Sequence, residues 1–137
     1  MRIGIISASF PPDFGWDGGA TRAYELAMGL KALGHEIEIF ALAAEIESET
    51  IQDGMRVHRV LVDQKLVQLK VVPKTTPNAL TIWSSRSALW KAALKAHAQR
   101  PFDVLDIPNI LWDGLLPAIS GLVPIVVRLQ EHESLYD

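Results

Sequence analysis

A glycine-rich segment near the start of the chain has the composition of an anion-binding loop. Residues 11–22 have the sequence PPDFGWDGGATR, in which Gly18 and Gly19 precede a predicted helix and Gly15 lies slightly upstream. Free N–H groups at a helix N-terminus attract anions, and glycine lets the backbone approach a phosphate closely. Arg22 in the first helical turn opposes the helix dipole, which indicates a role outside helix stability. We predict phosphate or sugar contact here; the alternative is a flexible loop whose glycines serve backbone conformation alone.

A second group of polar residues follows a predicted strand in the last third of the chain. Asp106 and Asn109 lie there close to Trp112, and Asp17 lies in the glycine-rich segment. A carboxylate and an amide beside a tryptophan commonly hold a sugar, so Asp17, Asp106 and Asn109 are candidate acceptor-binding residues. The competing interpretation is structural, with Asp113 capping a helix and Asp106 making a strand-end hydrogen bond.

The third candidate group ends the last predicted strand, in the sequence RLQEHE from residue 128 to 133. Arg128 is a candidate for acceptor binding, and Gln130 and His132 are candidate catalytic residues. His132 has the chemistry of a general base, but no partner for it is identifiable in the sequence. Fraying near the chain end is the competing explanation for this polar cluster.

Several better-defined chemistries lack their motifs. Gly19 is followed by Ala20-Thr21 rather than Lys-Ser/Thr, which argues against a nucleotide-triphosphatase loop. The glycine spacing and the apolar end of the second predicted strand disfavour a dinucleotide cofactor. The chain has no cysteine, no His-x-x-x-His pair and no Gly-x-Ser-x-Gly elbow. We therefore predict no metal and no cofactor.

The elements that must position these residues alternate between strand and helix. Apolar runs predict strands at 2–8, 36–42, 56–62, 103–107 and 124–129, with a less certain one at 67–72. Helical spacing predicts helices at 20–33, 76–99 and 113–120. This order predicts an α/β fold, a Rossmann-like doubly wound parallel sheet with the first strand at its centre. The carboxyl ends of its strands would then gather the three candidate groups at one edge. We expect the acidic residues of the second strand to face outward near a sheet edge.

Length and composition limit the organisation of the chain. It has 137 residues, 49% of them hydrophobic and 21% charged, which predicts a single domain over residues 1–137. The net charge of −3 hides an acidic stretch at 36–53 and a basic stretch at 56–100. The negative total argues against nucleic acid as a partner. No signal peptide or spanning segment is recognisable, so we expect a cytoplasmic location.

The basic stretch contains a predicted amphipathic helix with Trp83 and Trp90 seven residues apart. Such a helix can lie on an anionic membrane, which would place the protein peripherally at the inner membrane face. The alternative is that both tryptophans pack on the protein's own sheet. Self-association through an apolar surface is also left open.

Taken together, the segments resemble the N-terminal domain of family 4 glycosyltransferases, which have the GT-B fold. The resemblance is carried by MRIGII leading to FPP at 10–12, by Gly18-Gly19, and by the helix end and strand start LKALGHEI at 30–37. FDVLDIP at 102–108 and GLVPIVVRL at 121–129 are similar to later strand segments of the family.

The resemblance implies a retaining, metal-independent transfer of a sugar from a nucleotide-sugar donor. It implies that this domain binds the acceptor, whose identity is open, while its glycine loop approaches the donor diphosphate. The nucleotide would be held by a C-terminal domain that carries a glutamate pair absent here, or by a partner subunit. The family's usual histidine position corresponds to Gln130, with His132 two residues further on. The alternative is a non-catalytic binding or interaction module that needs a partner chain.

Overall fold

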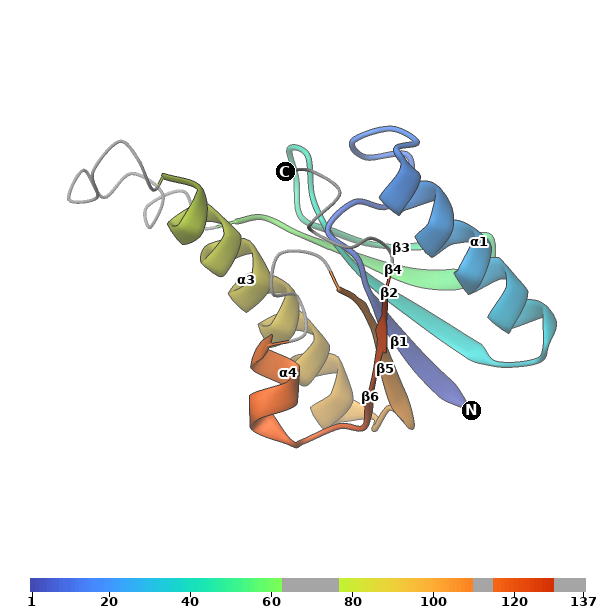
Figure 1. The fold of residues 1–137 in the computed structure, drawn as a ribbon. Helices are drawn as coiled ribbons and strands as arrows, with labels where there is room; N and C mark the ends of the chain where they lie inside the picture. Colours follow the sequence, from blue (N-terminus) through green and yellow to red (C-terminus); the bar gives the residue numbers. More distant parts are fainter. Residues whose placement is uncertain (63–76, 110–114, 130–137) are drawn as a thin grey trace.

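The computed structural model describes residues 1–62, 77–109 and 115–129, which form a six-stranded sheet with helices on both faces (Figure 1). The strands are β1 (Arg2–Ile6), β2 (Glu36–Leu42), β3 (Ser48–Gln52), β4 (Met55–Val60), β5 (Val104–Pro108) and β6 (Ile125–Arg128). The helices are α1 (Gly18–Ala32), α3 (Pro77–Gln99) and α4 (Leu115–Ser120). The strand order is β3-β4-β2-β1-β5-β6, and all pairings are parallel except β3 with β4.

β1 is the central strand that its continuous apolar run predicts. All five of its residues are buried, as expected for a parallel strand covered on both faces. Ile3 is in register with Ile37 of β2 on one side and with Val104 of β5 on the other. The change of direction in the strand order therefore falls beside β1, and the carboxyl ends of β1 and β5 flank it.

The two faces of the sheet have separate apolar cores. α1 covers one face with Ala23 and Ala27, which pack with Ile5, Ile39 and other buried residues. α3 and α4 lie on the opposite face (Figure 1), where Leu89 belongs to a cluster with buried residues of the sheet. The structure confirms a single α/β domain with a mostly parallel, doubly wound sheet.

The start of α1 differs slightly from the sequence prediction. The helix begins at Gly18, so Gly18 and Gly19 form its first turn rather than preceding it. Its first intrahelical hydrogen bond runs from the Thr21 amide to the Asp17 carbonyl at 2.9 Å. The amides of the two glycines come before that bond, so neither has a partner within the helix. At the other end, Gly34 has φ +88°, the left-handed conformation typical of a residue that follows a helix.

Strand β3 was missed by the sequence prediction, whereas β4, with which it forms a hairpin, corresponds to the strand predicted at 56–62. Asp53 and Gly54 have φ values of 50° and 74°, as a tight two-residue hairpin turn requires. Strand β3 is largely exposed and polar, so its residues lack an apolar pattern. β3 forms an antiparallel edge on an otherwise parallel sheet.

The prediction that the acidic residues of the second strand face outward near an edge is wrong. β2 lies inside the sheet between β4 and β1, and Glu38 is only 5% exposed. Glu38 is tolerated in the interior because Arg2 forms an ion pair with it and His58 lies within hydrogen-bond distance of it, both from the neighbouring strands. Glu36, at the start of the strand, remains exposed.

The predicted helix at 76–99 is confirmed as α3. Its two tryptophans differ in how far they are exposed to solvent. Trp90 is buried on the sheet, whereas Trp83 is 48% exposed. Within the described residues, no helix is long and apolar enough to cross a membrane. The uncertain strand at 67–72 lies outside the described residues.

Candidate functional site

The glycine-rich loop leaves the carboxyl end of the central strand and is the main feature of that sheet edge. We call residues 7–17 the β1–α1 loop. Its second half is fixed by Asp17, whose carboxylate accepts a hydrogen bond from the Ala20 amide at 2.6 Å and one from the Ser9 hydroxyl at 3.2 Å. Asp17 is therefore the N-cap of α1. The Asp17 carboxylate pairs with the backbone N–H of Ala20. Within the described residues, the N–H groups of Gly18 and Gly19 are left available to a ligand.

Two residues of the loop have left-handed backbone conformations. Phe14 has φ 61° and Gly15 has φ 75°, and the Gly15 amide donates to the Pro12 carbonyl at 3.1 Å. The predicted importance of Gly15 thus has a conformational component, since side chains rarely adopt this φ. The ring of Phe14 is 55% exposed, so packing does not explain its position.

Gly18, Gly19 and Arg22 lie on one exposed helix end, as the sequence predicts for an anion site. A Cβ added to Gly18 would meet no atom within 4 Å, so packing within the described residues does not require glycine there. Gly19 is more confined, because an added Cβ would lie 3.4 Å from the Asp17 carboxylate. Arg22 is exposed. This end of α1 combines open space, free amides and a cation, which suits a phosphate group.

Asp106 and Arg128 are brought together on neighbouring strands at the same edge. The Arg128 Nε donates to Asp106 Oδ1, and Asp106 is only 8% exposed. Burial raises the pKa of Asp106, and the hydrogen bond and charge of Arg128 offset this only in part. Asn109 follows β5, and its backbone N–H donates to the Arg128 carbonyl at 2.8 Å. Its side chain is exposed at this edge of the sheet. The contact with Arg128 is a hydrogen bond of the kind that the structural interpretation of Asp106 expects. A ligand-binding role for Asp106, Asn109 and Arg128 stays a prediction.

The remaining candidates cannot be placed. Gln130, His132, Trp112 and Asp113 lie outside the described residues, so their predicted roles stay predictions. Among the described residues, no group of three or more histidine or acidic side chains is placed to hold a metal ion.

Arg59 is a functional candidate that sequence reasoning missed. It lies on β4, is 6% exposed, and its Nη2 donates to the Pro11 carbonyl at 2.8 Å and to Gln52 Oε1 at 3.0 Å. Its Nε lies 3.4 Å from Asp13 Oδ1. Arg59 also borders an open hollow of about 700 Å³ between the β1–α1 loop and β3. In the sequence the only indication was an arginine within an apolar strand pattern.

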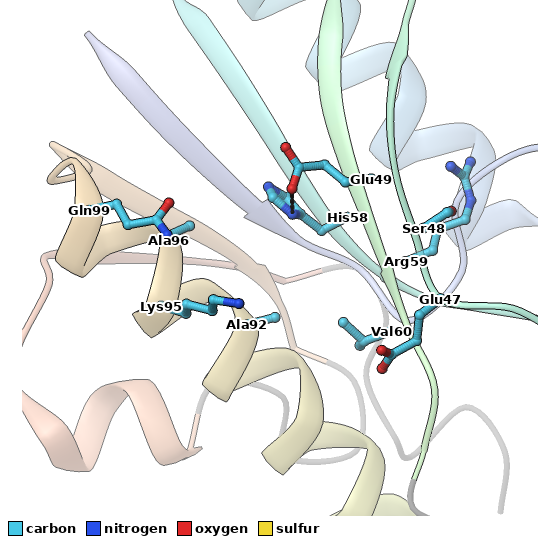
Figure 2. A pocket seen from close by; sticks show the side chains of 10 residues that line it. All are labelled: Glu47, Ser48, Glu49, His58, Arg59, Val60, Ala92, Lys95, Ala96 and Gln99. Atoms are coloured by element: carbon cyan, nitrogen blue, oxygen red, sulfur yellow. Dashed lines mark ion pairs between the residues drawn. The ribbon is translucent and has the colours of Figure 1, made fainter.

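A separate groove of about 380 Å³ lies on the other face of the sheet, between α3 and the β3–β4 hairpin (Figure 2). Lys95 and Gln99 border it from the helix, and Glu49 and His58 border it from the hairpin. Ala96 is a small residue on the helix side, which leaves space between the two walls. The walls carry charges of both signs, so the groove lacks the single-sign character of an anion site.

A chain of ion pairs crosses the sheet beneath that groove. His58 Nε2 lies 2.6 Å from Glu38 Oε1, and Arg2 Nη2 contacts the other oxygen of that carboxylate. The Arg2 guanidinium also lies 3.9 Å above the ring of Phe102. Burial alone would raise the pKa of Glu38, but the hydrogen bond from His58 and the charge of Arg2 hold it below its ordinary value. The buried carboxylate of Glu38 has a partner on each of its two oxygens, so we assign this network a structural role.

With this geometry established, the fold of the chain resembles part of a GT-B glycosyltransferase. The chain is similar to a solved structure of sucrose-phosphate synthase from Thermosynechococcus elongatus, a GT-B glycosyltransferase of family 4. The sequence identity is 15% and the TM-score is 0.60. That match covers 98% of this chain and 66% of the compared chain, which is one part of the enzyme. Against a longer structure of the same enzyme the identity is 17% and the TM-score 0.56, with 92% of this chain and 31% of the other covered.

The chain thus spans about a third of the longer synthase structure. No family model matches the sequence. No curated protein matches it either. At this level of identity the likeness establishes the fold.

Proposed function

We propose that the chain forms the acceptor-binding half of a retaining, metal-independent glycosyltransferase that uses a nucleotide-sugar donor. The observation that carries the proposal is the fold match over 98% of the chain, combined with a glycine-rich helix start at the carboxyl edge of the central strand. In open α/β sheets ligands bind outside the carboxyl ends of the strands, beside the change of strand order.

The parts of the site have distinct tasks in this proposal. The amides of Gly18 and Gly19, with Arg22, contact the donor diphosphate, because the helix dipole and free donors favour negative charge. Asp106, Asn109 and Arg128 line the acceptor side, and Asp17 fixes the loop between the two. Gln130 and His132 are the proposed catalytic positions. Transfer requires a cleft closed by a second domain, so residues 1–137 alone are expected to be inactive.

The diphosphate contact can be tested with uridine diphosphate as the probe and isothermal titration calorimetry as the readout. Gly18→Val adds a side chain where the protein itself leaves open space, so it obstructs an incoming phosphate without disturbing packing. We expect at least ten-fold weaker binding for Gly18→Val. Gly29→Ala, later in the same helix and also in open space, is the matched control and should bind as the unaltered chain does.

Equal affinity of Gly18→Val and the unaltered chain would contradict the assignment of the helix start. A panel with adenosine and guanosine diphosphates extends the test, because the donor nucleotide is not defined by these residues.

A further inference from the structure

Arg59 joins two parts of the molecule that are remote in sequence. On one side its guanidinium donates to Gln52 Oε1 of β3. On the other side it donates to the Pro11 carbonyl and lies 3.4 Å from the Asp13 carboxylate. The Asp13 carboxylate in turn accepts a hydrogen bond from the Ala44 amide at 3.0 Å. The first half of the β1–α1 loop is thus fastened to the hairpin and to the segment after β2.

We propose that Arg59 is a positioning residue that holds the β1–α1 loop in the shape that receives a diphosphate. The inference rests on the proposed function. Arg59 is 6% exposed, so its side chain is occupied by the protein and unavailable to a ligand. Its effect on binding must pass through the loop, because a loop already held in its bound shape loses less conformational entropy when the ligand arrives.

The chemistry of arginine fits this task better than that of lysine. A guanidinium holds its nitrogens in a fixed planar fork, so Nη2 donates to the Pro11 carbonyl and to Gln52 while Nε lies 3.4 Å from the Asp13 carboxylate. A lysine ammonium keeps the charge but carries all its donors on one nitrogen, so it cannot span the same set of partners. Arg59→Lys therefore removes the geometry of the contact while the charge of the site stays the same.

The first arm of the test measures amide hydrogen exchange by nuclear magnetic resonance in the full chain. We expect Arg59→Lys to accelerate exchange at the Gly15 and Ala44 amides at least ten-fold, since both hydrogen bonds belong to the fastened loop. The Ala43 amide, which donates to the Val60 carbonyl at 2.8 Å, is the internal reference and should exchange as before. Arg56→Met is the matched control, because Arg56 lies on the same strand but is exposed.

The second arm measures the affinity for inorganic pyrophosphate at several salt concentrations. Arg59→Lys should weaken binding at least five-fold with an unchanged salt dependence, because no charge is lost. Arg22→Met should weaken binding and also make its salt dependence shallower, because a cation close to the ligand is removed. If Arg59 had a merely structural role, Arg59→Lys would accelerate exchange at the Ala43 amide as much as at the Ala44 amide. Faster exchange at Ala44 alone would therefore exclude that role.

The proposal is overturned if Arg59→Lys leaves exchange at Gly15 and Ala44 unchanged, or if the loop loosens while pyrophosphate affinity stays the same. If the unaltered chain binds no pyrophosphate, the proposed diphosphate site fails. In that case the exchange rates still decide whether Arg59 fastens the loop.

Discussion

At the scale of single residues, Glu38 is a charged group that Arg2 and His58 hold in the sheet interior. The alternating sequence of the second strand predicts exposed acids, yet Glu38 is 5% exposed. Its partners Arg2 and His58 come from strands 36 and 20 residues away in sequence. Such pairings depend on the order of strands in the sheet, which local patterns do not contain. For the same reason Arg59 could not be assigned to the loop from the sequence.

Replacement of Glu38 tests this network through the pH dependence of stability. The pKa of Glu38 is lowered in the folded state. Its contribution is therefore fully present above the ordinary glutamate pKa of about 4.3 and is lost as pH falls through the lower folded-state value. We expect Glu38→Gln to cost about 1–3 kcal/mol of unfolding free energy at pH 7, because Arg2 loses its buried partner.

Urea denaturation of the unaltered chain and of Glu38→Gln at pH 7, 5 and 3.5 provides the measurement. The difference between the two should shrink at the lowest pH. Glu25→Gln, at an exposed position on α1, is the control and should change the stability little at any pH. A difference for Glu38→Gln that is constant over this range would contradict the account.

At the scale of elements, apolar periodicity predicted the buried strands and both long helices, since these bury a recognisable face. The exposed strand β3 was missed because its residues Ser48–Gln52 are largely polar. Asp53-Gly54, a typical two-residue hairpin turn, was the indication available in the sequence. The glycines of the proposed anion site were singled out from the sequence, but their place inside the first turn of α1 depends on Asp17 acting as the cap.

Two glycine substitutions test the elements in opposite directions. Gly54→Ala should destabilise the hairpin by about 1 kcal/mol, because alanine disfavours a φ of 74° and its Cβ would lie 2.8 Å from the Lys31 ammonium. Gly29→Ala, in the interior of α1 with open space around it, should stabilise the fold by about 0.5–1 kcal/mol. Thermal unfolding of both variants provides the comparison, and a gain in stability for Gly54→Ala would show that the turn is described wrongly.

At the scale of the whole molecule, the fold and the position of the glycine-rich helix start support the proposal of a domain that forms a cleft with a second one. The edge of the sheet that carries the β1–α1 loop also carries Asn109 and the Asp106–Arg128 pair. The groove between α3 and the hairpin lies on a face of the sheet rather than at this edge (Figure 2). We therefore predict that the diphosphate of a nucleotide ligand binds at this edge rather than in the groove.

The most direct test is a nuclear magnetic resonance titration of the isotopically labelled chain with uridine, adenosine and guanosine diphosphates. The account predicts that for at least one of them the largest amide shifts fall at residues 15–22 and at Asn109. Lys95 and Gln99, beside the separate groove, should be unaffected. Shifts concentrated at that groove, or none at the glycine-rich helix start with any of the three, would contradict the proposed donor-diphosphate site.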